Sequence, residues 1–256
     1  ITSIIFVDDY SYEAGHIFNG NAFAEYLQPQ AAVCGTRFTI FRHNVRKVCE
    51  TVNADFEIFE KQLLGQIEDL TASALKRTDL NLVCFHDNTH YLSSVFSSLF
   101  FLKSFLDVYA TLIAASIKPS QSLLFSSGRV DGEKVSGGKL INWLRGSTPE
   151  KYNDLSDVIF RHSQDWIHRA VQYRDTLVHY GDIAELHRMK VPLKPTTPPF
   201  TRDDILAPTM PHGEDVSGYA ISLAKNLNRF LSDTIPMLPN VDRKLIDLKE
   251  FPIQGN

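Results

Sequence analysis

Residues 45–74 run VRKVCETVNADFEIFEKQLLGQIEDLTASA, and their apolar positions recur at steps of three and four. This spacing places the apolar side chains along one face of an α-helix, so the stretch predicts a long amphipathic helix of about eight turns. The helix is expected to end before Asp79-Leu80-Asn81. The positions that form the apolar stripe are Val45, Val48, Val52, Phe56, Phe59, Leu63, Ile67, Leu70 and Ala74.

Three more helices are expected after this one. Residues 88–116 are apolar nearly all round, which predicts a buried helix, and their interruption by charged and hydroxyl side chains argues against a membrane span. A third helix is expected to begin with Thr148 as its N-cap and Pro149 at its first helical position, and to end at Gly181. A last helix, at about 214–232, has one apolar face. The Ser- and Gly-rich stretch before Thr148 is expected to be a loop.

The rest of the chain contains little regular pattern. Residues 1–40 mix short β-like runs, at 4–7 and 37–41, with Gly, Asn and Pro, which predicts an irregular N-terminal extension. Residues 183–191 are expected to form a short strand. We therefore expect an all-α protein: a four-to-five-helix up-and-down bundle over 41–256, with a small N-terminal extension and a short strand or hairpin before the last helix.

Composition limits the function. The 256 residues carry a net charge of −4, so no global basic field indicates nucleic acid. The cysteines, Cys34, Cys49 and Cys84, are odd in number and have no CxxC spacing, which favours reduced thiols over a disulfide framework or a zinc ribbon. The apolar start, residues 1–7, is too short for a signal sequence. We expect a soluble cytoplasmic protein with no membrane partner.

One short segment combines residue types that suit chemistry on a phosphodiester. Residues 173–181, YRDTLVHYG, bring Arg174, Asp175 and His179 together near the end of the expected third helix. Arginine is a permanent cation and histidine titrates near neutral pH, so such a pair can hold a phosphate and attack it. Five positions on an unbroken helix separate two side chains by roughly 140°. The pair therefore needs a break in the helix or a second copy of the chain, which points to a symmetric homodimer.

An arginine followed by a histidine after four to six residues also occurs at Arg37/His43 and at Arg161/His168, so the spacing alone is not specific. Arg37 lies in a β-like run, and His43 falls at the start of the first expected helix. Arg161 and His168 are seven positions apart, which would stack them on one helical face two turns apart. A solvated polar face explains that pair without function.

The sequence Arg174-Asp175-Thr176-Leu177-Val178-His179 resembles the ribonuclease motif of the HEPN superfamily (higher eukaryotes and prokaryotes nucleotide-binding). That motif is an arginine, a polar Asn, His or Asp, a few residues, and a histidine. The order of parts over about 44–235 is similar too: two long helices, a third that carries the motif, and a final helix.

The resemblance implies a homodimeric, metal-independent endoribonuclease of toxin or defence type. HEPN ribonucleases cleave RNA by attack of the 2′-hydroxyl on the adjacent phosphate, so DNA would be inert. His179 would be the general base or acid, Arg174 would neutralise the phosphorane, and Asp175 would orient one of them. Tyr173 and Tyr180 are expected to contact the RNA substrate. No metal and no cofactor are expected.

The resemblance also bears on partners. Many HEPN toxins are paired with a minimal nucleotidyltransferase antitoxin that adenylylates a tyrosine two residues after the histidine. Here Tyr180 follows His179 directly and Gly181 occupies the expected position, although an antitoxin or regulatory protein stays an expected partner. The alternative is a catalytically inactive HEPN-like helical module that binds a partner protein or a nucleotide. Arg174 and His179 would then only stabilise the last turns of a helix, where cations are favoured.

Two weaker patterns have simpler explanations. His86-Asp87-Asn88-Thr89-His90 places two histidines four apart, as in a metal pair, but its Asp, Asn and Thr also suit a helix N-terminus. Ser136-Gly137-Gly138-Lys139 imitates a Ser-x-x-Lys nucleophile without its companion motifs, and it lacks the Ser or Thr that follows the lysine of a phosphate loop. We interpret the first as a helix cap and the second as chance.

Overall fold

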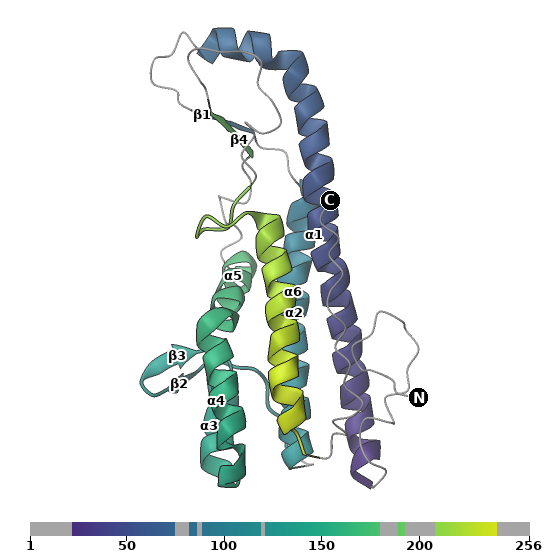
Figure 1. Cartoon of the computed structure of the whole chain (residues 1–256), viewed down its shortest axis with the longest axis vertical. Helices are drawn as coiled ribbons and strands as arrows, with labels where there is room; N and C mark the ends of the chain where they lie inside the picture. The colour runs from purple at the N-terminus through teal and green to yellow at the C-terminus, as the bar shows by residue number, and fades with distance from the viewer. Residues whose placement is uncertain are drawn as a thin grey trace. The chain divides into compact units, whose positions relative to one another are not determined.

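The computed structural model of the chain describes residues 22–74, 82–85, 89–118, 121–179, 189–192 and 208–239. Most of these residues are helical (Figure 1), which confirms the expected all-α class. The chain divides into two compact units. The first unit consists of Ile1–His43, Ser97–Asp175 and Ser222–Asn256, and the second consists of Asn44–Phe96 and Thr176–Ile221.

The first helix, α1, runs from Ala22 to Ala74 and contains the predicted stripe, of which Val45, Val48 and Val52 are buried. It begins earlier than predicted, and residues 37–41, expected to be β-like, lie inside it. The reason is that the steps of three and four continue toward the N-terminus through the buried residues Leu27, Ala31, Cys34, Phe38 and Phe41. The irregular extension is therefore wrong for residues 22–40. Residues 1–21 lie outside the described residues, and the division of the chain at residue 40 stays a prediction.

The second and last helices agree with the predictions. Helix α2 spans Thr89–Ile117, and helix α6 spans Val216–Thr234. Within the described part of the chain, Leu92–Ile117 is long and apolar enough to cross a membrane by length and composition, and 56% of its most apolar window is buried. A core helix of a soluble protein has the same properties, and the cytoplasmic location stays a prediction.

The expected third helix is a composite of four pieces. A 3₁₀ turn, Glu150–Tyr152, leads into α4, Asn153–His162, then into a π-helical turn, Ser163–Ile167, and then into α5, His168–His179. Thr148 is not its N-cap: Thr148 follows the preceding helix and donates its hydroxyl to the Leu144 carbonyl over 2.6 Å. The capping prediction is wrong because a helix already occupies the stretch before Thr148.

That stretch was expected to be a loop, and it is structured. Strands β2, Gly128–Val130, and β3, Glu133–Val135, form an antiparallel hairpin, and α3 follows at Gly138–Ser147. Asp131 and Gly132 join the strands with φ of 51° and 89°, the two positive values that an Asp-Gly type I′ turn needs. Arg145 of α3 bonds Asp131 of this turn at 3.0 Å and Asp157 of α4 at 2.8 Å, which ties the hairpin, α3 and α4 together.

Aromatic rings connect the helices of the first unit. The ring of Phe38 on α1 lies 5.7 Å from that of Phe105 on α2, and Phe105 stacks on Tyr109 one turn later at 5.5 Å. Tyr109 meets Phe230 of α6 edge-on at 5.6 Å, and Phe230 meets the imidazole of His162 on α4 at 5.2 Å. Ring contacts in the first unit therefore connect α1 with α2, α2 with α6, and α6 with α4.

The second unit contains a two-stranded sheet. Strand β1, Leu82–Phe85, pairs antiparallel with β4, Met189–Pro192, so a strand does precede the last helix as expected.

At the start of α6, the Asp215 carboxylate accepts a hydrogen bond from the backbone N–H of Gly218 at 2.7 Å. Burial, followed by the nearby Asp215 charge, raises the pKa of the Cys49 thiol on α1. Cys49 is thus a weakly reactive thiol.

Candidate functional site

Arg174 and Asp175 lie in the first unit, where the second turn of α5 meets the third. The Nη1 of Arg174 donates to Oδ1 of Asp175 over 2.7 Å, and the two side chains are 25% and 46% exposed. Among the described residues, Nε of Arg174 is buried and has no hydrogen-bond partner. A buried guanidinium N–H without an acceptor is costly.

His179 belongs to the second unit and is the last residue of α5. It is exposed, and its neighbour Val178 is 54% exposed. α5 continues without a break from Arg174 to His179, so a break in the helix, one of the two ways of bringing these side chains together, is absent there. Asp175 and His179 are four positions apart, which is the spacing of neighbouring side chains on one helical face.

Two tyrosines, Tyr173 and Tyr180, lie directly beside the residues of the motif. Tyr173 is buried, with 8% of its surface exposed, and the RNA contact expected of it stays a prediction. Tyr180 lies outside the described residues, as does Gly181.

The two other Arg/His pairs have structural explanations. The guanidinium of Arg37 lies over the Phe101 ring at 5.6 Å, between α1 and α2, whereas His43 is exposed. Arg161 and His168 are separated by the π-helical turn, Ser163–Ile167. Because a π-turn holds more residues than an α-turn, the expectation that this pair stacks on one helical face is wrong.

His168 instead supports the β-hairpin. Its Nδ1 is 3.1 Å from the Ser136 hydroxyl and its Nε2 is 3.2 Å from the Gln172 amide nitrogen. Desolvation and the charge of Lys134 lower the pKa of His168, which favours the neutral imidazole. Ser163 also donates its hydroxyl to the Ser136 carbonyl. Ser136 is fully buried. The serine of the Ser-x-x-Lys pattern therefore has a structural role, as an anchor of the hairpin.

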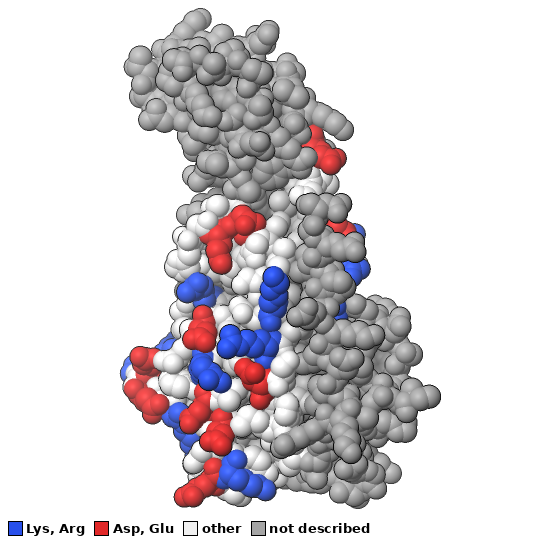
Figure 2. All heavy atoms as spheres, viewed as in Figure 1, with Lys and Arg blue, Asp and Glu red and all other residues white. Residues whose placement is uncertain are grey.

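Charges of both signs mix on the surface. On the face drawn in Figure 2, Lys and Arg side chains alternate with Asp and Glu. The ion pair between Lys47 and Glu50, at 2.8 Å, and the pairs of Arg145 are examples. The mixture agrees with the net charge of −4 and leaves local groups such as Arg174 to provide any contact with phosphate.

The histidine pair at His86 and His90 has the spacing of two metal ligands, although no metal is expected. Among the residues that the structure describes, no group of three or more His, Cys, Asp or Glu is arranged to hold a metal ion. His86 and Asp87 lie outside those residues, and the metal independence of the proposed chemistry stays a prediction.

The sequence patterns did not indicate the polar network around His162. His162 contacts Trp166 four positions later and Asp233 on α6, 71 positions away in the chain. The i,i+4 spacing of a histidine and a tryptophan hinted at the first contact, but nothing local in the sequence indicated the second.

Comparison of the chain with protein-family models, with curated proteins and with solved structures finds no match. The resemblance to HEPN proteins therefore rests on the motif at Arg174–His179 and on the order of the helices.

Proposed function

We propose that the chain is a metal-independent endoribonuclease of toxin or defence type, with an HEPN-like bundle that acts as a homodimer. The observation that carries the proposal is the contrast along α5: none of the described residues provides a hydrogen-bond partner for the buried Nε of Arg174, and His179 is exposed at the end of the same helix. A guanidinium donor and an exposed imidazole are the two groups that phosphodiester cleavage needs.

In the proposed reaction, His179 takes the proton of the ribose 2′-hydroxyl as its oxygen attacks the adjacent phosphorus. The new P–O2′ bond forms as the P–O5′ bond breaks, the departing 5′-oxygen takes a proton from water, and His179 afterwards returns the proton it took to solvent. Arg174 donates to the phosphorane oxygens and balances their charge. The products are a 2′,3′-cyclic phosphate and a 5′-hydroxyl, and the atoms balance without a metal or a cofactor.

A homodimer would bring an arginine and a histidine to one phosphate, which the helical spacing prevents within a single copy. Arg174 and His179 lie about 140° apart around a continuous helix, so one copy does not aim both at a single phosphate. In a symmetric dimer, the arginine of one copy and the histidine of the other face the same phosphate. Asp175 lies one turn before His179 and orients its imidazole.

The decisive test is cleavage of single-stranded RNA with EDTA present. Wild type is expected to cleave and to leave cyclic-phosphate ends, because the 2′-hydroxyl is the nucleophile, whereas DNA of the same sequence stays intact. His179→Ala is expected to lower the rate by about 10²–10⁴-fold, the size of a general acid–base contribution. Arg161→Ala, a change at an exposed arginine of α4, is the matched control and is expected to cleave like wild type. Equal cleavage by His179→Ala and wild type would refute the role of His179.

One observation favours the alternative of a catalytically inactive HEPN-like module. Asp175 holds Nη1 of Arg174 at 2.7 Å and places a negative charge beside the proposed phosphate site. If the chain binds RNA, a nucleotide or a partner protein but wild type leaves RNA uncut, this alternative replaces the ribonuclease. An antitoxin or regulatory protein that binds near α5 is compatible with both functions.

A further inference from the structure

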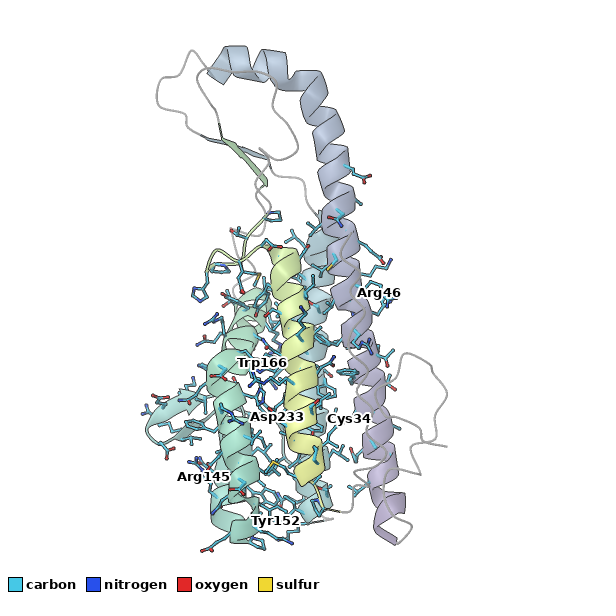
Figure 3. The ribbon with its side chains drawn as sticks, in the orientation of Figure 1. Cys34, Arg46, Arg145, Tyr152, Trp166 and Asp233 are labelled. Carbon is cyan, nitrogen blue, oxygen red and sulfur yellow. The ribbon has the colours of Figure 1, made fainter. Side chains whose placement is uncertain are left out.

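His162 lies in the interior of the first unit, at the end of α4, with 4% of its surface exposed. Both nitrogens of its ring are hydrogen-bonded. Nδ1 lies 3.1 Å from the indole Nε1 of Trp166, and Nε2 lies 2.9 Å from Oδ2 of Asp233. In Figure 3, Trp166 and Asp233 lie where α4 and the π-helical turn face α6. The imidazole therefore bridges two elements that are far apart in the chain.

The partners determine where the proton of His162 lies. An indole nitrogen can only donate a hydrogen bond, so Nδ1 of His162 must accept with its lone pair. A neutral imidazole then carries its one proton on Nε2 and donates it to the Asp233 carboxylate. The hydrogen bonds thus run in one direction, from Trp166 through His162 to Asp233.

Few described charges surround this ring. From α6, Asp233 is the direct partner, and Nε of Arg229, whose side chain is 73% exposed, lies 4.0 Å from the same carboxylate oxygen. From α2, Tyr109 packs on Phe230 beside the imidazole, and burial raises the pKa of its hydroxyl, which stays neutral. Trp166, on the π-helical turn, is uncharged and 8% exposed.

We propose that His162, at the end of α4, is a proton-operated switch between α4 and α6. A second proton, taken from solvent at Nδ1, removes the lone pair that accepts from Trp166, so that hydrogen bond breaks. The Nε2–H bond to Asp233 remains and becomes an ion pair. Protonation therefore keeps the connection to α6 and releases the indole at the π-helical turn. This switch does not depend on ribonuclease activity.

The tautomer can be tested on the wild-type chain. With ¹⁵N-labelled protein, long-range ¹⁵N–¹H correlation spectra distinguish a protonated from an unprotonated ring nitrogen. The expected result near neutral pH is a His162 ring protonated on Nε2 and unprotonated on Nδ1. A ring protonated on Nδ1, or on both nitrogens, would overturn the inference.

The switch is tested by the indole N–H resonance of Trp166, isolated with Trp143→Phe and followed from about pH 8 to about pH 5, the range in which histidine titrates. The resonance is expected to shift with the same midpoint as the His162 ring nitrogens. His162→Gln, which does not titrate there, is expected to abolish the shift, whereas His43→Gln, at an exposed histidine of α1, is expected to leave it unchanged.

Three outcomes would contradict the switch: a Trp166 shift that persists in His162→Gln, a Trp166 resonance that does not move while His162 titrates, and a His162 ring that stays neutral until the chain unfolds in acid. If His162→Gln fails to fold, His162→Asn replaces it and is expected to abolish the Trp166 shift in the same way.

Discussion

At the scale of single residues, the interior of the first unit contains polar groups with defined donors and acceptors. Thr234 at the end of α6 donates its hydroxyl to the Phe230 carbonyl at 2.7 Å, so at its 2.7 Å contact with Tyr109 the tyrosine is the donor. Both residues are fully buried. The stability that the protein loses with this contact therefore depends on which of the two hydroxyls is removed.

We predict that Thr234→Val costs more stability than Tyr109→Phe. The valine leaves the Tyr109 hydroxyl buried without an acceptor, a loss of about 1–3 kcal/mol. The phenylalanine removes one hydrogen bond but lets Thr234 keep its own, a loss of about 0.5–1.5 kcal/mol. Urea unfolding of the two variants measures the free energy of unfolding, and the reverse order would contradict the donor assignment.

Alkaline pH should destabilise the fold through two buried groups. Burial raises the pKa of the Cys34 thiol and of the Tyr109 hydroxyl, so above about pH 8.5 for cysteine and about pH 10 for tyrosine the unfolded chain releases a proton that the folded chain keeps. The unfolded state then binds fewer protons, and stability falls as pH rises, by about 1.4 kcal/mol per pH unit for each group. Urea unfolding across this range should show a smaller slope for Cys34→Ala than for wild type. Equal slopes would show that the thiol ionises equally in both states.

At the scale of elements, the hairpin and α3 depend on two glycines with positive φ. At Gly132, φ 89°, in the β2–β3 turn, an added Cβ atom would meet nothing within 4 Å. At Gly137, φ 79°, an added Cβ atom would lie 2.5 Å from the Phe125 ring. Both positions disfavour other residues through the backbone, but only Gly137 also does so through packing.

We therefore predict that Gly137→Ala is more destabilising than its matched control, Gly132→Ala. The control should lose about 1–2 kcal/mol from the left-handed backbone alone. Gly137→Ala should lose about 1–3 kcal/mol more, because the methyl group displaces a fully buried ring. Thermal or urea unfolding compares the two, and equal losses would mean that Phe125 moves aside without cost.

Some of these elements can be predicted from local sequence patterns alone, and others cannot. The stripe of α1 is a local property, and its steps of three and four also continue through the buried residues from Leu27 to Phe41, so residues 22–40 can be recognised as helix from the sequence. The Asp131-Gly132 turn is likewise a recognisable local signal that a loop prediction overlooked. The π-helical turn at Ser163–Ile167 is different, since its stretch continues an ordinary apolar pattern and its conformation depends on contacts such as that of Ser163 with Ser136.

At the scale of the whole molecule, the proposed ribonuclease requires two copies of the chain. We predict that Arg174→Ala and His179→Ala are each inactive alone and regain activity when they are mixed and refolded together. Half of the dimers would be mixed, and one of their two sites would combine an intact arginine with an intact histidine. The expected activity is about a quarter of wild type. Sedimentation verifies that the variants are dimers, and dimers without recovered activity would contradict a site shared between copies.

The sequence by itself determined the long helices, the all-α class and the Arg174–His179 motif, because each depends on side chains a few positions apart on one backbone period. It did not determine which buried polar groups meet. Thr234 meets Tyr109, and Asp233 meets His162, across 125 and 71 positions of chain. Only tertiary packing brings such groups within hydrogen-bonding distance, because the pairing depends on which helix faces lie against each other. That packing decides which ring nitrogen of His162 donates and which accepts, the basis of the proposed switch.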